Sequence, residues 1–589
     1  MKHGQLLWGD SLHHIAHPEV EMLRRYAKIS EEMETAISGG FADDLAPLKD
    51  IEIVDRIRDD LRSVNEIYES FRSFQKYEAD SRKLFIPQDT WTDLADTILN
   101  NPISSIPNTL QRIHNLIVAV NLFQQVLQVI VEKNCDYDQS PAQVLYNLYN
   151  MVAWTQLKGY MLIQFSAQVY ELFGKEGNHR SEAILLRRKY QHNALVTANA
   201  VKSAMKIASR QLWKCDPTTH DKDKTYTELN RLLQGYLVNE EDLSGEKNCK
   251  KSCDAYQYTA KHKCSVGKYY CEDPVCDGAV YNCQFIDADM SVCPGKTENR
   301  RYTYINYENG RKLGYDQTCN TSERKVDSWW KFFVHCAYCM CICADLQHSD
   351  RYFNLREYSA DTKNNRVVTG LKFVKVNSVI HLQIQQGQLL PYGVINQTTI
   401  HWQQVDNYEV NDGTLIKKYH TLSWKERGID LDEVVVPDEH VVTGVRFRLA
   451  GANLKLEILA SPINFTSGKL METASRSTWH SNFDPSNKRS ELNLDNRDVP
   501  TKASSPSKMI STSGQYLRFT HTGIEADVAQ STVPFIDVQP VVSDLPVPLG
   551  GVGVYYKGEE GFGGFIAPKI ITYDYSKYIE VASTAMRDP

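Results

Sequence analysis

The spacing of apolar residues divides the chain into a helical first part and a strand-rich last part. From Ile51 to Phe74, apolar residues recur every three or four positions, which is typical of a helix with one buried face. The same spacing predicts further helices near residues 17–37, 90–101, 106–134, 140–174, 180–213 and 224–237. We therefore expect a helical bundle over residues 1–240.

The helix expected over residues 106–134 differs from its neighbours because it carries no charge between Asn115 and Val131. Its apolar residues are interrupted by four amides, namely Asn121, Gln124, Gln125 and Gln128. This composition favours a central helix that the others surround. The alternative is a membrane-inserting hairpin formed with the 140–174 helix, although no run of about 18 apolar residues provides an ordinary membrane span.

Toward the C-terminus the apolar period changes to two, which is typical of strands with one buried face. Residues 366–373 return as residues 440–447 with the shared core Val-Val-Thr-Gly, and a second apolar strand follows each copy. A third, divergent copy is expected to begin near residues 516–519 and to continue through residues 550–568. We expect residues 350–589 to form a domain of antiparallel repeats.

The cysteines predict a disulfide framework. Of 14 cysteines, twelve fall within residues 245–345, where little periodic apolar pattern is present. Cross-links must therefore replace part of a hydrophobic core there, and an oxidising compartment follows. A zinc or thiolate site in the run from Cys336 to Cys343 is the alternative. The cysteines expected to pair are Cys135, Cys215, Cys249, Cys253, Cys264, Cys271, Cys276, Cys283, Cys293, Cys319, Cys336, Cys339, Cys341 and Cys343.

These patterns predict a multidomain α + β protein. Its expected parts are an all-α helical bundle over residues 1–240, a disulfide-rich module over 245–345 and an all-β domain over 350–589. Residues 470–513 are rich in Ser, Asn, Asp, Lys and Pro, so we expect a long, mobile insertion in the β domain.

The net charge and the glycosylation sequons agree with an extracellular protein. The formal net charge is −7, which argues against a nucleic-acid partner because neutralising phosphates requires a basic excess. Glycosylation is expected at the sequons of Asn320, Asn396 and Asn464. The first ten residues lack the apolar stretch of a signal peptide, so we expect the printed chain to be a mature or truncated form of a secreted protein.

A search for catalytic motifs finds none that stands in a suitable context, and no cofactor or metal is expected. The best candidate for ligand recognition is a segment rich in glycine and aromatic residues near the C-terminus, because glycine permits close approach and flat rings stack on sugars. The alternative there is a glycine-kinked hairpin with packed aromatics. The candidate ligand-binding residues are Tyr555, Tyr556, Phe562, Gly563 and Gly564.

The two Val-Val-Thr-Gly copies, the sequence Trp329-Trp330-Lys331 before the last cysteine run, and the helical first half resemble a family of large secreted arthropod glycoproteins of uncharacterised role. This resemblance implies no reaction and no site residues. Three antiparallel units look like a β-prism, the fold of some lectins, and a bundle followed by such a domain resembles the three-domain insecticidal crystal toxins. The cysteine-rich module departs from the toxin pattern.

We therefore expect a non-enzymatic extracellular recognition protein, lectin-like in character, whose partner is a glycan or a protein ligand. One alternative is a membrane-active toxin or defence protein that uses the helical bundle at a membrane surface. A second is an enzyme with an unrecognised site, in which two carboxylates in a cleft hydrolyse a glycoside. The oligomeric state stays open.

Overall fold

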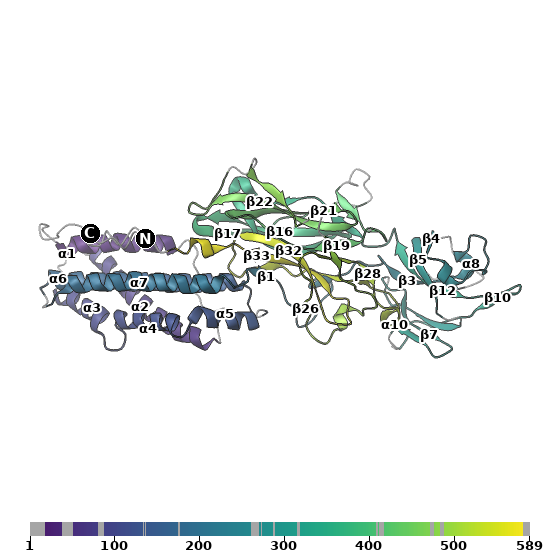
Figure 1. The fold of residues 1–589 in the computed structure, drawn as a ribbon, viewed down its shortest axis with the longest axis horizontal. Helices are drawn as coiled ribbons and strands as arrows, with labels where there is room; N and C mark the ends of the chain where they lie inside the picture. Colours follow the sequence, from purple (N-terminus) through teal and green to yellow (C-terminus); the bar gives the residue numbers. More distant parts are fainter. Residues whose placement is uncertain are drawn as a thin grey trace.

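The molecule is elongated, and its three parts lie in a line (Figure 1). The helical bundle is at one end, the β domain is in the middle, and the disulfide-rich module is at the far end. The module comes before the β domain in the chain but lies beyond it in space. The computed structural model describes residues 18–37, 51–80, 88–133, 135, 137–174, 177–260, 270–271, 274–286, 289–297, 299–314, 318–407, 410, 418–471, 476–482, 484 and 488–580.

The bundle is built around one long helix. Every residue of α6 from Lys158 to Tyr170 is buried, and apolar faces of the other helices pack against it. The buried ammonium of Lys158 donates to Asn65 Oδ1 (3.0 Å) and lies over the Tyr68 ring. The helices are α1 (Pro18–Ile37), α2 (Glu52–Asp80), α3 (Gln88–Asn100), α4 (Ile106–Val118), α5 (Leu122–Glu132), α6 (Pro141–Leu172) and α7 (His179–Met205).

The expected 106–134 helix is two helices, and it is not the central one. The chain breaks between α4 and α5 at Asn121, whose φ of +55° is incompatible with a continuing helix, and the two axes differ by 56°. Both helices keep one exposed face, so α6 occupies the place predicted for them. Among the described helices, none alone is long and apolar enough to cross a membrane, whereas α4 and α5 together meet that test of length and composition.

The bundle ends earlier than predicted. The helix expected over residues 224–237 is absent, and the segment instead contains β2 (Tyr226–Thr227) and the start of β3 (Gln234–Asn239). The helix expected over residues 180–213 ends at Met205, and β1 (Gln211–Leu212) follows it. Leu229, Leu232 and Leu233 have helical spacing, but they are buried in the core of the β domain. Tertiary packing therefore overrides the local pattern there.

Three long hairpins organise the β domain, each at the centre of its own sheet. In each sheet a short preceding strand pairs parallel to the second strand of the hairpin, namely β13 with β16, β19 with β22 and β30 with β33. The inner faces of the three sheets share one hydrophobic core. The hairpin strands are β15 (Arg366–Val376), β16 (Val379–Leu390), β21 (His440–Ala450), β22 (Asn453–Asn464), β32 (Leu549–Gly558) and β33 (Phe565–Thr572). The short strands are β13 (Tyr352–Asn354), β19 (Gly428–Leu431) and β30 (Phe535–Asp537).

The three units exchange strands in a closed cycle. Strand β14 (Tyr358–Ser359) of the first unit pairs with β21 of the second, and β20 (Glu433–Val435) of the second pairs with β32 of the third. Strand β31 (Val541–Val542) of the third unit pairs with β15 of the first. All three exchanged strands run antiparallel to their partners. The multidomain α + β class is thus confirmed, and its β domain has the prism-like arrangement expected from the repeats.

The repeated Val-Val-Thr-Gly lies where the exchanged strand of the neighbouring unit pairs with the first strand of the hairpin. In both copies the threonine occupies a β-bulge, and the following glycine pairs with the incoming strand. A Cβ at Gly444 would lie 2.8 Å from Ser359 Oγ, and a Cβ at Gly370 would lie 2.5 Å from Val542 Cγ1. Glycine is required because the neighbouring unit approaches closely.

The third copy is displaced from its predicted start. Its bulge lies between Leu549 and Gly551, so Gly550 and Gly551 replace the Thr-Gly pair. A Cβ at Gly551 would lie 2.5 Å from the Val434 carbonyl oxygen of the exchanged strand. Strand β27 (Gln515–Arg518), where the copy was expected to begin, pairs with β19 and belongs to the second sheet.

The described residues of the 470–513 insertion are tied to the β domain. Arg489 is mostly buried, and its guanidinium lies 2.7 Å from Asp432 and 3.4 Å from Asp430, two buried carboxylates on or next to β19. Strand β26 (Lys508–Met509) adds to the third sheet beside β32. The expectation of a mobile insertion is corrected for these described residues, because buried ion pairs and strand pairing hold them against the β domain.

The described residues of the disulfide-rich module contain two four-stranded sheets and a separate two-stranded hairpin. Strand β12 (Tyr338–Asp345) is buried along its whole length, and it pairs with β3 and with β5 (Gly278–Phe285). The second sheet has the order β8-β7-β6-β9. Its strands are β6 (Met290–Pro294), β7 (Tyr302–Tyr307), β8 (Lys312–Gly314) and β9 (Arg324–Val326).

The predicted disulfide framework is present among the described residues. Alternate cysteines of β12 cross-link it to neighbouring segments, and one further bridge joins the loop before α6 to the segment after α7. Cys271 is also disulfide-bonded, and Cys264 lies outside the described residues. The six pairs are Cys135–Cys215, Cys249–Cys336, Cys253–Cys339, Cys276–Cys343, Cys283–Cys341 and Cys293–Cys319. Such a framework is typical of an extracellular protein.

Candidate functional site

The segment expected to recognise a ligand lies inside the β domain. Tyr555 and Tyr556 on β32 are only 2% and 3% exposed. The Tyr555 hydroxyl donates to the Lys214 carbonyl oxygen (3.5 Å), and the Tyr556 hydroxyl donates to the Phe562 carbonyl oxygen (3.4 Å). Burial raises the pKa of Tyr556 to about 12. The expectation of an open aromatic surface is therefore corrected, since the chain itself covers both rings.

The two candidate glycines, Gly563 and Gly564, lie in the turn between β32 and β33. Gly564 has a φ of +59°, and a Cβ there would lie 2.4 Å from the Lys557 carbonyl oxygen. A Cβ at Gly563 would lie 2.4 Å from Val533 Cγ1. Phe562 is half-buried in the same turn. The segment is thus the glycine-kinked hairpin with packed aromatics that was the alternative interpretation.

A buried charge cluster explains why the segment is covered. The Lys557 ammonium lies 2.9 Å from Asp216 and 2.7 Å from Asp537. Burial raises the pKa of Asp537, whereas at Asp216 the charge of Lys557 and hydrogen bonds from Ser507 outweigh burial and lower the pKa. These ion pairs hold the segment that follows the bundle against the third sheet.

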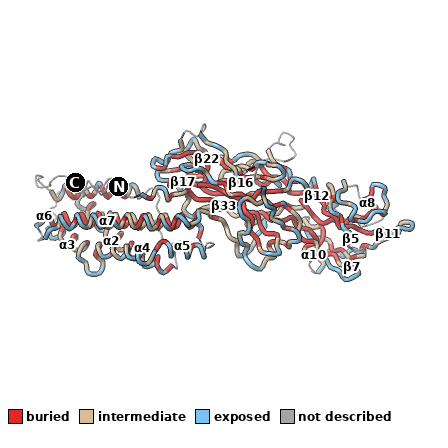
Figure 2. The backbone as a smooth tube through the Cα atoms, viewed as in Figure 1, coloured by how far each residue is buried: buried red, intermediate tan, exposed pale blue. Residues whose placement is uncertain are grey.

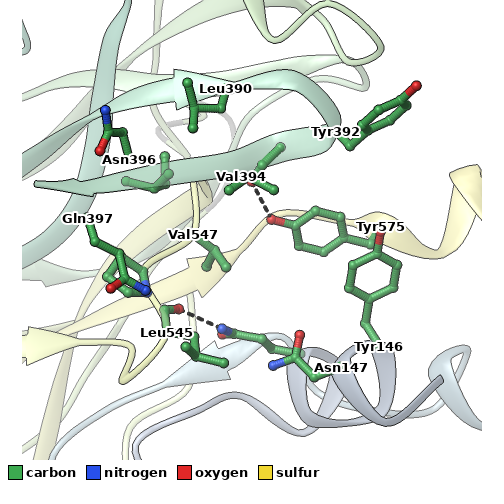
Figure 3. Close-up of a pocket in the computed structure, with 14 residues that line it drawn as sticks. Tyr146, Asn147, Leu390, Tyr392, Val394, Asn396, Gln397, Leu545, Val547 and Tyr575 are labelled. Carbon is green, nitrogen blue, oxygen red and sulfur yellow. Dashed lines mark hydrogen bonds between the residues drawn. The ribbon is translucent and has the colours of Figure 1, made fainter. Parts of the chain in front are cut away.

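A cavity of about 280 Å³ opens where the bundle meets the β domain (Figure 3). Three parts of the chain line it. They are the start of α6, the turn from β16 into β17 (Val394–Trp402), and the segments on either side of β32 and β33. The lining residues are Gln143, Tyr146, Asn147, Leu390, Tyr392, Gly393, Val394, Ile395, Asn396, Gln397, Leu545, Pro546, Val547 and Tyr575. Sequence analysis offered only Asn396 among them, as a sequon.

Hydrogen bonds and a ring stack fix one wall of the cavity. The rings of Tyr146 and Tyr575 stack at 4.4 Å, and the Tyr575 hydroxyl donates to the Gly393 carbonyl oxygen (3.0 Å). The Gln143 amide donates to the Leu545 carbonyl oxygen at 2.7 Å (Figure 3). Burial raises the pKa of Tyr146 to about 12, so its hydroxyl stays protonated. These contacts join the bundle to the β domain around the cavity.

Amide side chains and tyrosines make up half of the lining residues, the others are aliphatic or small, and none is charged. Asn147 on α6 donates to Gln139 Oε1 (3.2 Å), and Gln397 is exposed on the opposite wall. Asn396 accepts the Thr398 hydroxyl at 2.8 Å and donates to Gln388 Oε1 at 3.4 Å. These groups offer directional hydrogen bonds without a fixed charge.

Tyr392 stands at the rim of the cavity in an unusual conformation. Its φ is +63°, a region that bulky residues rarely adopt, and its side chain is 48% exposed. The Tyr392 backbone N–H donates to the Phe465 carbonyl oxygen (2.8 Å), which holds the turn in place. Strained residues concentrate at functional sites. The Pro-Tyr-Gly sequence that follows the second apolar strand of the first repeat could have indicated a turn at this position.

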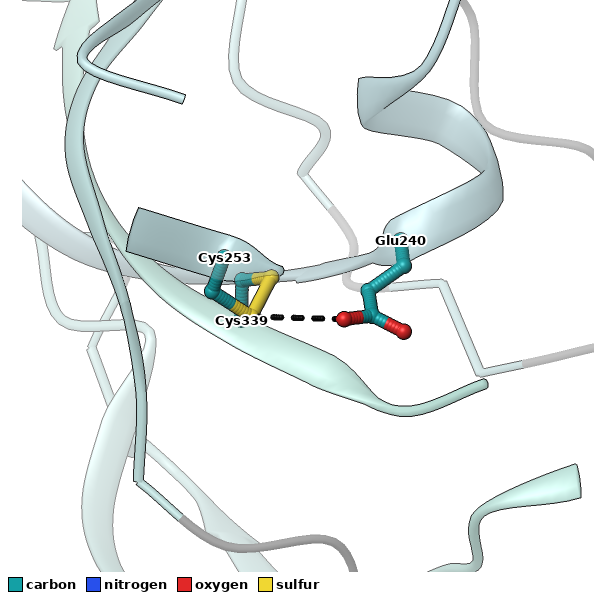
Figure 4. A group of neighbouring side chains, drawn as sticks. All are labelled: Glu240, Cys253 and Cys339. Carbon is teal, nitrogen blue, oxygen red and sulfur yellow. Dashed lines mark hydrogen bonds between the residues drawn. A yellow bond between two sulfur atoms is a disulfide. The ribbon is translucent and has the colours of Figure 1, made fainter. Parts of the chain in front are cut away.

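Two other side-chain groups have the composition of a metal site, but their cysteines are oxidised. Glu240 Oε1 lies 3.8 Å from Sγ of Cys253, which is bonded to Cys339 (Figure 4). Burial raises the pKa of Glu240, opposed by the Ala337 backbone N–H, which donates to its carboxylate (2.9 Å). The second group combines Glu241 with the Cys249–Cys336 disulfide. A disulfide sulfur offers no thiolate, so neither group is a cysteine-ligated metal centre.

The three sequons lie in different surroundings. Asn320 and Asn464 are exposed, and Asn396 is half-buried at the cavity. Glycosylation stays a prediction at all three positions.

Comparison with known proteins gives one family and no activity. The family described as a domain of unknown function (DUF4803) matches residues 132–384, from the end of α5 to the first hairpin of the β domain. No curated protein matches the chain. The match therefore crosses all three parts of the molecule, and its description assigns no reaction, ligand or site.

Proposed function

We propose that the protein is a non-enzymatic extracellular recognition protein that binds a neutral carbohydrate in the cavity between the bundle and the β domain. The observation that carries this proposal is the chemistry of the lining: amides, backbone carbonyls and tyrosines surround about 280 Å³ with no charged side chain. The disulfide framework supports an extracellular location.

The lining matches what a sugar requires. Hydroxyl groups need paired donors and acceptors, and Asn147 and Gln397 offer both on opposite walls. The hydrophobic faces of a pyranose pack on flat rings and on aliphatic side chains such as Val394 and Val547. An acidic ligand would lack a cationic partner there, and burying an uncompensated charge is costly. A neutral oligosaccharide is therefore the ligand class that fits best.

The same lining argues for binding without hydrolysis. Glycoside hydrolysis ordinarily needs two carboxyl groups that face each other across the bond to be cleaved. None of the residues that line the cavity is Asp or Glu. Asp430 and Asp432, which lie close together in the β domain, are occupied by Arg489.

A glycan array tests the proposal with the full chain. Neutral oligosaccharides should be bound, and sialylated or sulfated ones should not. The double variant Asn147→Leu/Gln397→Leu should weaken binding about tenfold or more, because each lost polar contact costs roughly 1 kcal/mol. Thr398→Ala is assayed in parallel, since it removes the sequon and keeps any attached glycan from covering the mouth of the cavity.

Tyr258→Ala is the matched control, because Tyr258 is exposed on β4 (Tyr258–Ala260) of the disulfide-rich module and does not line the cavity. It should bind as the unaltered protein does. The proposal fails if no neutral glycan binds above background in either the parent or Thr398→Ala protein. It also fails if the double variant binds equally well.

A further inference from the structure

The far end of the molecule is a hairpin whose tip consists of two exposed phenylalanines. Strands β10 (Trp329–Lys331) and β11 (Val334–Cys336) pair so that Lys331 faces Val334, which leaves Phe332 and Phe333 as a two-residue loop. The two side chains are 90% and 96% exposed. The hairpin extends beyond the rest of the disulfide-rich module (Figures 1 and 2).

The residue types in this loop are unusual for a two-residue hairpin turn. Phe332 has a φ of +55°, in the left-handed region that two-residue hairpin loops usually fill with Asn, Asp or Gly. A bulky residue there costs about 1–3 kcal/mol of strain. Exposing two phenyl rings brings no compensating burial within the described part of the chain. The loop is thus poorly suited to stabilising the fold and well suited to presenting apolar side chains.

The base of the hairpin is held firmly, so the tip is presented in a fixed place. Cys336 at the end of β11 is bonded to Cys249. Trp329 Nε1 donates to Glu241 Oε1 (3.2 Å). The Lys331 ammonium lies 3.1 Å from Glu241 and donates to the Lys247 carbonyl oxygen (2.6 Å). Ordering the tip in advance reduces the entropic cost of binding.

We propose that this hairpin inserts its tip into the surface of a lipid bilayer. The order of side chains along it follows the depth profile of a membrane interface, with Phe332 and Phe333 outermost and Trp330 (70% exposed) behind them. The tip is convex and lies at the end of the long axis, so a flat surface reaches it without contacting the other domains. A deformable lipid surface accepts such a shape without a preformed pocket.

Charge near the base of the hairpin favours an anionic surface. Lys250 and Lys251 are exposed next to Cys249, and Lys247 lies beside Lys331. Lys331 pairs with Glu241 and Lys247 pairs with Asp242, so these charges cancel, and the exposed carboxylate of Glu246 offsets part of the charge of Lys250 and Lys251. Anionic lipid should therefore strengthen binding that the aromatic residues drive. This surface belongs to the disulfide-rich module and is separate from the helical bundle considered for membrane activity above.

Vesicle flotation of the full chain tests the proposal. The probes are vesicles of phosphatidylcholine alone and of phosphatidylcholine with phosphatidylserine at a ratio of about four to one. The unaltered protein should float with both, and more completely with the anionic vesicles. The double variant Phe332→Asn/Phe333→Gly should bind about tenfold or more weakly, because burying a phenylalanine side chain is worth about 1.5–3 kcal/mol. Asn-Gly is a preferred two-residue loop, so this variant keeps the hairpin.

Tyr258→Ala removes another exposed aromatic side chain from the same module and should float as the unaltered protein does. The proposal is overturned if the unaltered protein floats with neither kind of vesicle, which would leave a protein partner for the tip. It is equally overturned if the double variant floats as well as the parent. Glycan-free vesicles keep this test independent of the cavity.

Discussion

Two aromatic segments of this protein differ in their exposure to solvent. The segment around Tyr555 and Tyr556 is rich in glycine and aromatic residues, yet both rings are buried in the β domain. The segment from Trp329 to Val334 is also aromatic but contains no glycine, and Phe332 and Phe333 are almost fully exposed. Both segments are rich in aromatic residues, so aromatic content alone does not decide which segment can meet a ligand.

The difference comes from what lies over each segment. Strand β32 has partners on both sides, since β33 flanks one edge while β20 and β26 flank the other, and the chain that follows the bundle crosses it through Lys214 and Asp216. The β10–β11 hairpin forms a two-stranded sheet of its own at the end of the molecule. Aromatic residues are available for binding only where no later or earlier segment of the chain returns to cover them.

The largest expected effect is on stability. Tyr555→Ala should lower the free energy of unfolding by about 3–5 kcal/mol, because it leaves a cavity in a packed core. Phe333→Ala should change the free energy of unfolding by less than about 0.5 kcal/mol, since its ring contacts solvent. Calorimetry of the two variants beside the unaltered protein measures the difference. Equal losses of stability in the two variants would contradict the difference in burial between the two segments.

Lowering the pH should reduce the free energy of unfolding of the β domain by a smaller amount. Burial lowers the pKa of His381 to about 4, and Asp406 opposes that shift only weakly. Nδ1 of His381 shares a hydrogen bond with the Tyr358 hydroxyl (2.9 Å). Asp406 forms an ion pair with Arg356 (2.8 Å). Between about pH 6.5 and pH 4, His381 therefore stays neutral in the folded protein but is protonated in the unfolded chain.

The sign of the effect is set by which state binds the proton. Above about pH 6.5 the full contribution of His381 to stability is present, and it is lost as the pH falls from about 6.5 to about 4. The loss should reach about 3 kcal/mol, since each pKa unit corresponds to about 1.4 kcal/mol. In His381→Asn, where the amide replaces Nδ1 beside Tyr358, unfolding followed over that pH range should depend less on pH. An unchanged slope would mean that His381 is accessible in the folded protein.

The sequence predicts the general architecture well where one local pattern decides the outcome. The stripe from Ile51 to Phe74 is a helix, the Val-Val-Thr-Gly copies begin hairpins, and the cysteines pair. The 224–237 segment misleads because Leu229 and Leu232 have helical spacing but are buried in the core that the three units of the β domain share. The third repeat was misplaced because Gly550 stands where threonine stands in the other copies.

The candidate sites were harder to predict, because each depends on segments far apart in the chain. The cavity combines Asn147, Tyr392 and Val547, which come from the bundle and from two units of the β domain. No local spacing links them. The hairpin tip carried a better signal, since two phenylalanines stand between short apolar strands just before Cys336, whose disulfide fixes the base of the hairpin.

Hydroxyl-radical footprinting of the native full chain, read by peptide mass spectrometry, tests the contrast between the two aromatic segments most directly. The structure predicts that Trp330, Phe332 and Phe333 are modified at rates close to those of the unfolded chain, while Tyr555 and Tyr556 stay unmodified until the β domain unfolds. Rapid modification of the two tyrosines in the native protein, or protection of the two phenylalanines in the absence of any partner, would contradict the account.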